Sequence, residues 1–145
     1  MLNIDLNLRV VINTNQQDWD PSPMPGVWRK PLAREEVESG HTTSIVRFDP
    51  GSYFSRHEHP LGEEILVLEG TFSDEHGDYG SGTYFRNPPG SGHTPFSENG
   101  CMLLVKLDQF APEDTTAVRI DTQNTPWSAQ ARKLIQKKLK RLKGR

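Results

Sequence analysis

The sequence predicts an all-β fold, a barrel or two-sheet sandwich, with an extended N-terminal arm and one C-terminal helix. Short β-prone segments follow one another at turn-limited spacing, and 12 glycines and 11 prolines supply frequent turns. A helical periodicity of apolar residues is confined to the end of the chain. The 145 residues suffice for one domain with a core, although only 33% of them are hydrophobic.

Residues 1–40 are expected to form a strand and an extended arm within the same domain as the rest of the chain. Residues 1–12 alternate in part between apolar and polar side chains, which indicates an N-terminal strand. Residues 13–35 contain several turn-forming residues and therefore indicate an arm or loop: Pro21, Pro23, Pro25, Gly26 and Pro31.

Residues 41–122 are expected to form the barrel. A β-prone segment at 41–48 ends at the turn signal Asp49-Pro50-Gly51. Further short strands, separated by turns, are expected at 53–59, 63–69, 71–74, 82–86, 93–96 and 101–108. The apolar runs 65–68 and 102–105 indicate strands at the centre of the sheet, buried on both faces.

Residues 125–145 are expected to form an amphipathic helix with a basic outer face. Its apolar residues recur every three or four positions: Trp127, Ala131, Leu134, Ile135, Leu139 and Leu142. Thr125 and Pro126 suit a helix N-terminus. Residues 132–145 carry eight basic and no acidic residues, whereas 1–131 carry nine basic and 19 acidic ones. The helix could therefore pack on its own acidic body or on a second subunit.

Several classes of protein are not expected. No apolar run approaches about 18 residues and no basic start precedes an apolar stretch, so we expect neither a membrane span nor a secretory signal. A single cysteine, Cys101, excludes an internal disulfide framework and favours a buried, inert thiol. We therefore expect a cytoplasmic protein. The basic helix lacks interleaved aromatic residues, so nucleic acid is not an expected partner.

Three histidines and one glutamate have spacings that suit a single metal ion. His57 and His59 alternate along a strand and therefore project to the same side. The Pro60-Leu61-Gly62 turn brings Glu63 back beside them, and His93 follows a Pro/Gly-rich turn that can return a strand across the barrel. Three nitrogens and one oxygen suit Fe(II) or Zn(II), and also Mn, Ni or Co. We predict one divalent metal per chain on these four residues.

Other residues near these segments leave alternatives open. Glu64 could replace Glu63, but adjacent strand residues face opposite sides, so only one of them can reach the ion. His76 in a turn and His41 at the start of a strand are expected to lie outside the site. Tyr53 and Ser55 share the strand parity of His57 and His59 and could therefore face a substrate. Tyr84 and Arg86 share one face of their own strand and could also contact a substrate, although core packing of Tyr84 and a surface salt bridge of Arg86 would explain them equally well.

The two segments resemble the signatures of the cupin family. Residues 51–70 fit G-x5-H-x-H-x3-E-x6-G at every specified position, and residues 82–93 fit G-x5-P-x-G-x2-H. The sequence departs from the second signature at Ser97, where cupins usually carry Asn. The resemblance implies a cupin β-barrel, the jelly-roll-like double-stranded β-helix, with metal ligands at His57, His59, Glu63 and His93. It also implies a homodimer.

Residues 63–101 more narrowly resemble the cupin half of ChrR-type anti-sigma factors, and this branch is similar to the acetylacetone-cleaving dioxygenases, which hold iron on three histidines. Two functions follow as expectations. The first is an oxidoreductase, a mononuclear non-haem Fe(II) dioxygenase acting on a small dicarbonyl compound. The second is a non-catalytic zinc-binding sensor. No catalytic residue beyond the metal ligands is predicted.

Overall fold

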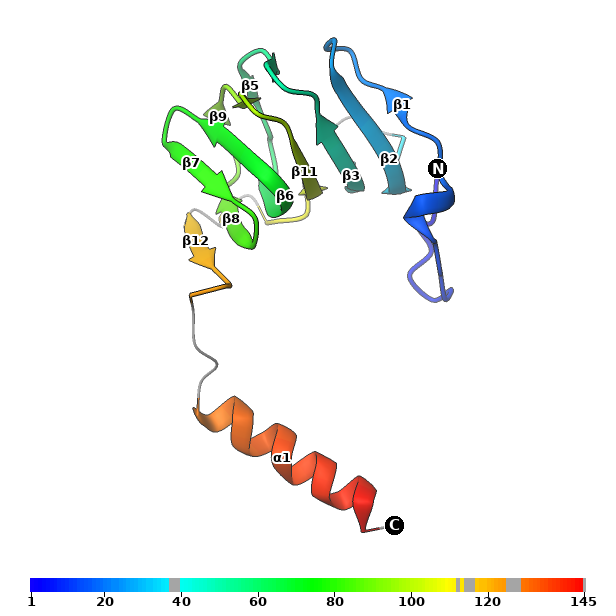
Figure 1. Cartoon of the computed structure of the whole chain (residues 1–145). Coiled ribbons are helices and arrows are strands. Elements are labelled where there is room, and N and C mark those ends of the chain that lie inside the picture. Colours follow the sequence, from blue (N-terminus) through cyan, green and yellow to red (C-terminus); the bar gives the residue numbers. More distant parts are fainter. Residues whose placement is uncertain (37–39, 112, 114–116, 125–128, 145) are drawn as a thin grey trace.

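A computed structural model of the whole chain confirms the expected all-β fold with one C-terminal helix (Figure 1). The structure describes residues 1–36, 40–111, 113, 117–124 and 129–144, with helix side chains only from residue 136 onward. The elements are the 3-10 turn η1 Thr14–Gln16, β1 Asp20–Pro21, β2 Val27–Arg34, β3 Thr42–Phe48, β4 Ser52–Tyr53, β5 His57–Glu58, β6 Glu63–Asp74, β7 Gly77–Gly80, β8 Thr83–Asn87, β9 Gly92–His93, β10 Phe96–Ser97, β11 Cys101–Leu107, β12 Val118–Asp121 and α1 Ala129–Lys143.

Two antiparallel sheets make up the body. A ten-stranded sheet runs in the order β1-β2-β3-β11-β6-β10-β4, with β7 and β8 also paired to β6 and with β12 paired to β8. The second sheet contains only β5 and β9. Figure 1 shows the strands curving around a common interior. The strand pairing therefore joins distant parts of the chain around one core.

Strands β6 and β11 lie at the centre of the large sheet, as the apolar runs predicted. Ile65, Val67, Leu103 and Val105 are buried, whereas the alternate residues of the two runs are partly buried or, at Leu68, exposed. One face of each strand is thus fully covered, rather than both. Aromatic rings complete the core, with Phe72 at its centre and in ring contact with Phe48, Tyr79 and Phe85.

Strand β6 continues through Gly70, where the sequence predicted that one strand ends and another begins. Gly70 has a φ of 73°, and the pairing of β6 with β11 shifts register beside it, between Met102 and Leu103. Glycine adopts this left-handed conformation without the steric cost that a Cβ adds. A bulge thus bends the strand and keeps it continuous.

The N-terminal region differs from the expectation. Residues 1–12 form no strand, and only Leu2 makes a bridge, to Arg34. Within the segment expected to be a loop, β2 pairs with β3 along its length. Pro31 is tolerated because the pairing shifts register between Pro31 and Ala33. The sheet therefore begins before residue 41, where the barrel was expected to start.

Smaller differences concern short strands and the helix. The segment 53–59 divides into β4 and β5, the segment 93–96 divides into β9 and β10, and β7 and β12 were not anticipated. Helix α1 begins at Ala129, so the expected cap at 125–126 and Trp127 lie outside the described residues. Leu139 and Leu142 are exposed. Within the described part of the chain, no helix combines the length and apolar character needed to cross a membrane.

Candidate metal centre

Strand pairing and one tight turn bring the four predicted ligands together. His57 on β5 lies directly opposite His93 on β9. His59 follows β5, and the turn before β6 is closed by a hydrogen bond from the Gly62 N–H to the His59 carbonyl (3.1 Å). Glu63 is the first residue of β6. The pairing of β5 with β9 and the turn between β5 and β6 therefore bring the four side chains together.

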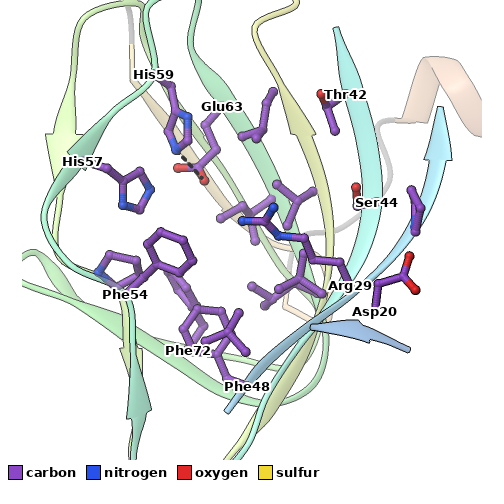
Figure 2. A pocket seen from close by; sticks show the side chains of 18 of the residues that line it. Asp20, Arg29, Thr42, Ser44, Phe48, Phe54, His57, His59, Glu63 and Phe72 are labelled. Atoms are coloured by element: carbon purple, nitrogen blue, oxygen red, sulfur yellow. Dashed lines mark ion pairs between the residues drawn. The ribbon is translucent and has the colours of Figure 1, made fainter. Parts of the chain in front are cut away.

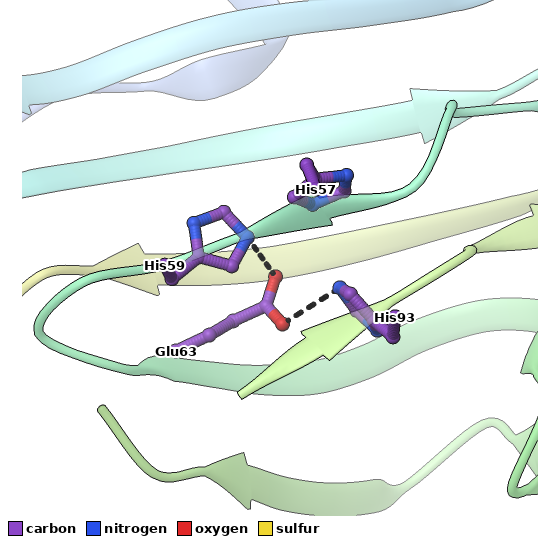
Figure 3. A group of neighbouring side chains, drawn as sticks. All are labelled: His57, His59, Glu63 and His93. Carbon is purple, nitrogen blue, oxygen red and sulfur yellow. Dashed lines mark ion pairs between the residues drawn. The ribbon is translucent and has the colours of Figure 1, made fainter. Parts of the chain in front are cut away.

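The four side chains offer donor atoms that lie within 4.8 Å of one another (Figure 3). The Nε2 atoms of His59 and His93 are 3.4 and 3.1 Å from the two Glu63 carboxylate oxygens. The His57 ring centroid is 4.6 Å from that of His59 and 5.0 Å from that of His93. The carboxylate thus lies between two imidazoles, with the third imidazole alongside.

This arrangement fits a divalent cation better than a hydrogen-bonded cluster. The Nε2 atoms of His59 and His93 are buried and have no hydrogen-bond partner, although both approach Glu63. Buried nitrogens that lack an aligned hydrogen bond are costly, and a cation beside Glu63 would satisfy both of them. Ligands that share one ion at about 2.1 Å lie at most roughly 4.2 Å apart. The cluster therefore needs only a small contraction to hold an ion.

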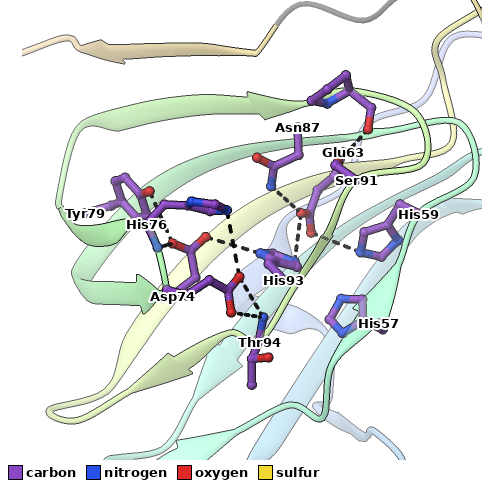
Figure 4. A network of polar contacts seen from close by, with 12 residues as sticks. His57, His59, Glu63, Asp74, His76, Tyr79, Asn87, Ser91, His93 and Thr94 are labelled. Carbon is purple, nitrogen blue, oxygen red and sulfur yellow. Dashed lines mark hydrogen bonds and ion pairs between the residues drawn. The ribbon is translucent and has the colours of Figure 1, made fainter.

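Neighbouring groups orient the ligands (Figure 4). His57 Nδ1 lies 2.9 Å from the Ser55 carbonyl oxygen, which can only accept, so Nδ1 carries the hydrogen and Nε2 the lone pair. His93 Nδ1 is 3.3 Å from Asp74 Oδ2. The Asn87 side-chain amide donates to Glu63 Oε2 (3.1 Å). Such contacts fix ring orientation and ligand basicity at metal sites.

Asp74, which the sequence did not predict as a site residue, contacts His93 on the side away from Glu63. Its side chain is buried at the end of β6 and also accepts hydrogen bonds from the Tyr79 hydroxyl (3.3 Å) and the His76 backbone N–H (2.9 Å). A carboxylate behind a ligating imidazole is a common arrangement in metal sites. Its strand parity with Phe72 would have been the available signal, because both side chains face the interior.

The pKa values of the ligands are shifted in different directions. Burial lowers the pKa of His57, and its histidine neighbours add to the effect. Burial acts in the same direction on His93, but its contacts with Asp74 and Glu63 prevail and raise the pKa of His93 to about 9. Burial would raise the pKa of Glu63, yet contacts with His59 and His93 hold it well below its usual value. Without a metal, Glu63 is therefore a carboxylate facing a protonated His93.

The centre opens onto a cavity of about 420 Å³ (Figure 2). His57, His59 and Glu63 line this cavity, whereas His93 lies behind them and is only 3% exposed. Much of the remaining wall is apolar and includes Phe54, whose ring contacts that of His57 at 5.1 Å between centroids. Small-molecule sites have this size and character. The arrangement could hold a metal and present it to a ligand.

Glu64 is separated from the cluster, as strand alternation predicted. Its carboxylate accepts a hydrogen bond from the Tyr84 hydroxyl (2.8 Å). His76 and His41 also lie elsewhere, each beside a glutamate carboxylate at about 4 Å. Cys101 is buried, and burial raises the pKa of its thiol to about 11, in keeping with an inert residue. Glu63 is thus the carboxylate of the cluster.

None of the four predicted substrate contacts is among the described residues that line the cavity. Tyr53 is mostly exposed, and Ser55 contributes its carbonyl to His57. Tyr84 bonds to Glu64, and the Arg86 guanidinium lies over the Phe110 ring at 5.6 Å. Their substrate role stays a prediction. The cavity wall that the sequence did not predict includes residues of β3 and also of β2, which lies in a segment expected to be a loop.

Sequence and structure comparisons agree with this architecture. The sequence profile of the ChrR cupin-like domain matches residues 7–111. No curated protein sequence matches the chain. In the crystal structure of Rhodobacter sphaeroides SigE in complex with the anti-sigma ChrR, the matched chain is 26% identical with a TM-score of 0.56. That match covers 66% of this chain and 52% of the other, so the chain spans about half of that relative's length.

Two further solved structures share the fold. An acetylacetone dioxygenase from Acinetobacter johnsonii is 20% identical with a TM-score of 0.58, and the match covers 69% of this chain and 72% of that one. A candidate acetylacetone dioxygenase from Methylibium petroleiphilum PM1 is 18% identical with a TM-score of 0.63, covering 84% and 96%. The expected cupin fold is confirmed. Because the profile matches most of its length, the chain belongs to the ChrR cupin-like domain family.

Proposed function

We propose that this protein is a mononuclear non-haem Fe(II) enzyme that uses dioxygen to oxidise a small dicarbonyl compound. The observation that carries the proposal is that three members of the ligand cluster line a cavity of substrate size, whereas a structural metal site would be closed. Four protein ligands also leave two positions free on an octahedral ion, enough for a chelating ligand.

A bound Fe(II) would supply Lewis-acid activation of a chelated carbonyl and a route for electrons to dioxygen. The chain's own residues prepare the site for this chemistry. The Glu63 carboxylate offsets part of the charge of a divalent ion, and Asp74 holds His93 in position. Phe48, Phe54 and Phe72 line the cavity and restrict the access of water.

The relatives support this reading at the level of the fold, since two of the similar structures carry the name acetylacetone dioxygenase. One experiment tests it. Metal-free protein is reconstituted with Fe(II), and oxygen uptake is measured with acetylacetone. We expect uptake that is lost in His57→Ala and kept in His41→Ala, because His41 lies outside the cluster. No uptake by the iron-loaded wild type would contradict the proposal.

A second candidate is a zinc-binding domain without catalysis that senses a small molecule or an oxidant. The observation that favours it is the match to the ChrR cupin-like family, together with the 26% identity to a chain of the SigE–ChrR complex. Metal analysis of protein purified without added metal distinguishes the two. Tightly held zinc and no oxygen uptake with Fe(II) would favour the sensor, whereas bound iron with uptake would favour the enzyme.

We also propose that the protein is a homodimer. The N-terminal arm leaves apolar side chains uncovered by the described part of the chain, including Leu6 at 94% and Val11 at 75% exposure. A second copy would bury such residues. Light scattering after size exclusion should give about twice the 16.4 kDa chain mass, and the monomer mass would contradict the proposal. A cytoplasmic location stays a prediction from the sequence.

A further inference from the structure

The cavity contains a cationic side chain that belongs to none of the predicted sites. Arg29 projects from β2 and lines the cavity together with His57, His59 and Glu63. Figure 2 shows its side chain extending from the strand into the interior. The cavity therefore offers a guanidinium as well as the metal ligands.

Arg29 has no counter-ion among the described residues, since neither a hydrogen bond nor an ion pair joins its guanidinium to any of them. Asp20 is its cross-strand neighbour, but the two side chains form no ion pair, and Figure 2 shows Asp20 directed away from the guanidinium. Both Glu63 oxygens already contact His59, His93 or Asn87. A partly buried cation without a partner is costly, so it indicates a partner that arrives from outside.

Further observations point to an anion as that partner. Burial lowers the pKa of Arg29, and the nearby positive charge of Arg34, which also lines the cavity, adds to the effect. Arginine nonetheless stays protonated in proteins. A divalent ion with one carboxylate ligand would itself be positive, so the metal centre and Arg29 would both favour a negatively charged ligand.

The metal cluster and Arg29 both approach the ring of Phe54. The Arg29 guanidinium carbon is 5.8 Å from the centroid of Phe54, and Phe54 meets His57 edge-on at 5.1 Å. A ligand that lies along this ring can therefore contact both groups at once. The cavity of about 420 Å³ has room for a chain of several carbon atoms.

We propose that Arg29 binds a carboxylate of the substrate, so that this site takes small dicarbonyl acids in preference to neutral diketones. The inference rests on the proposed function, because it assigns the dicarbonyl end of the ligand to the metal centre and the carboxylate end to Arg29. The planar fork of a guanidinium donates parallel hydrogen bonds to both oxygens of a carboxylate, which a lysine cannot do.

A matched pair of ligands tests the proposal. The probes are 4,6-dioxoheptanoate and its methyl ester, which share the dicarbonyl group and differ in the negative charge. Binding to zinc-loaded protein is measured by calorimetry, because zinc excludes turnover during the titration. We expect the acid to bind at least about tenfold more tightly than the ester in the wild type, as a charge-assisted hydrogen bond provides.

Variants of the chain then locate the effect. In Arg29→Gln we expect the acid-to-ester ratio to fall to within about twofold, and in Arg29→Lys to an intermediate value, because the charge stays and the fork is lost. Arg119→Gln is the matched control, since Arg119 also lies over a ring, that of Tyr79, but on the exposed surface outside the cavity. It should keep the wild-type ratio.

The outcomes separate the two proposals. A wild-type ratio near one, an unchanged ratio in Arg29→Gln, or no binding of either compound would overturn the role of Arg29. Should Arg29→Gln fail to fold, the wild-type ratio and Arg29→Lys still decide. Repeating the titration without metal tests whether the metal centre binds the dicarbonyl group. If the acid is still preferred and neither affinity depends on metal, the result would support the role of Arg29 and contradict the proposed metal enzyme.

Discussion

Metal binding to the cluster should release a proton from His93. Without metal, His93 lies between the carboxylates of Asp74 and Glu63, 3.3 and 3.1 Å from its two ring nitrogens. Burial opposes the charged imidazolium, but these contacts raise the pKa of His93 to about 9. A metal ion needs the neutral ring, so below pH 9 the ion has to displace the proton. The proton therefore competes with the metal.

The number of protons released and the loss of metal affinity both follow from the difference between the pH and the pKa of His93. Between pH 7 and 8 nearly all His93 is protonated, so each ion bound should release about one proton from this residue. The apparent affinity should fall about tenfold for each unit of pH below 9, to roughly 100-fold below its limit at pH 7. His57 adds no proton in this range, because its pKa is lowered.

Calorimetry with zinc in buffers of different ionisation enthalpy measures the released protons directly. Asp74→Asn should release fewer protons at pH 8 than the wild type, because removing this carboxylate lowers the pKa of His93. Asp78→Asn is the control, since Asp78 is exposed and contacts Ser73 instead of His93. A wild type that binds zinc at pH 7.5 and releases no proton would refute the reasoning.

Three further outcomes are expected. His93→Ala should lose stoichiometric zinc by elemental analysis, whereas His76→Ala should keep it, because His76 lies outside the cluster; equal retention would contradict the ligand assignment. Phe72→Ala should lower the free energy of unfolding in urea by about 3–5 kcal/mol, since the ring is 1% exposed at the centre of the core, and a loss under about 1 kcal/mol would disprove that placement. Gly70→Ala should cost about 1–3 kcal/mol and Gly80→Ala much less, because a Cβ at Gly70 would strike the Gly100 carbonyl; equal losses would argue against the bulge.

The ligand cluster could be predicted because its information is local. His57, His59 and Glu63 lie within one turn and its flanking residues, and the strand alternation that sets their direction can be read directly from the sequence. The same alternation separates Glu64 from Glu63, and the structure has Glu64 bonded to Tyr84. The position of His93 could be predicted only from the second cupin signature, because the pairing of β5 with β9 joins segments that are far apart in the sequence.

The cavity wall could not be predicted in the same way. Arg29 lies in a segment where prolines favour a loop, yet β2 forms there because β3 offers a partner and the register shift beyond Pro31 removes the conflict. The short strands β7 and β12 likewise owe their existence to pairing with β6 and β8. Intrinsic preferences in such segments are weak, so tertiary pairing decides their conformation.

The division of the ligands between two sheets has a mechanical consequence. His57 and His93 belong to the pair β5–β9, whereas Glu63 starts a strand of the ten-stranded sheet. An ion bound by all of these ligands would link the two-stranded sheet to the ten-stranded sheet. Amide hydrogen exchange at residues 57–58 and 92–93 should therefore slow on loading with zinc, while exchange along β3 and β11 stays constant. The rigidity of β5 and β9 would then report whether the metal centre is occupied.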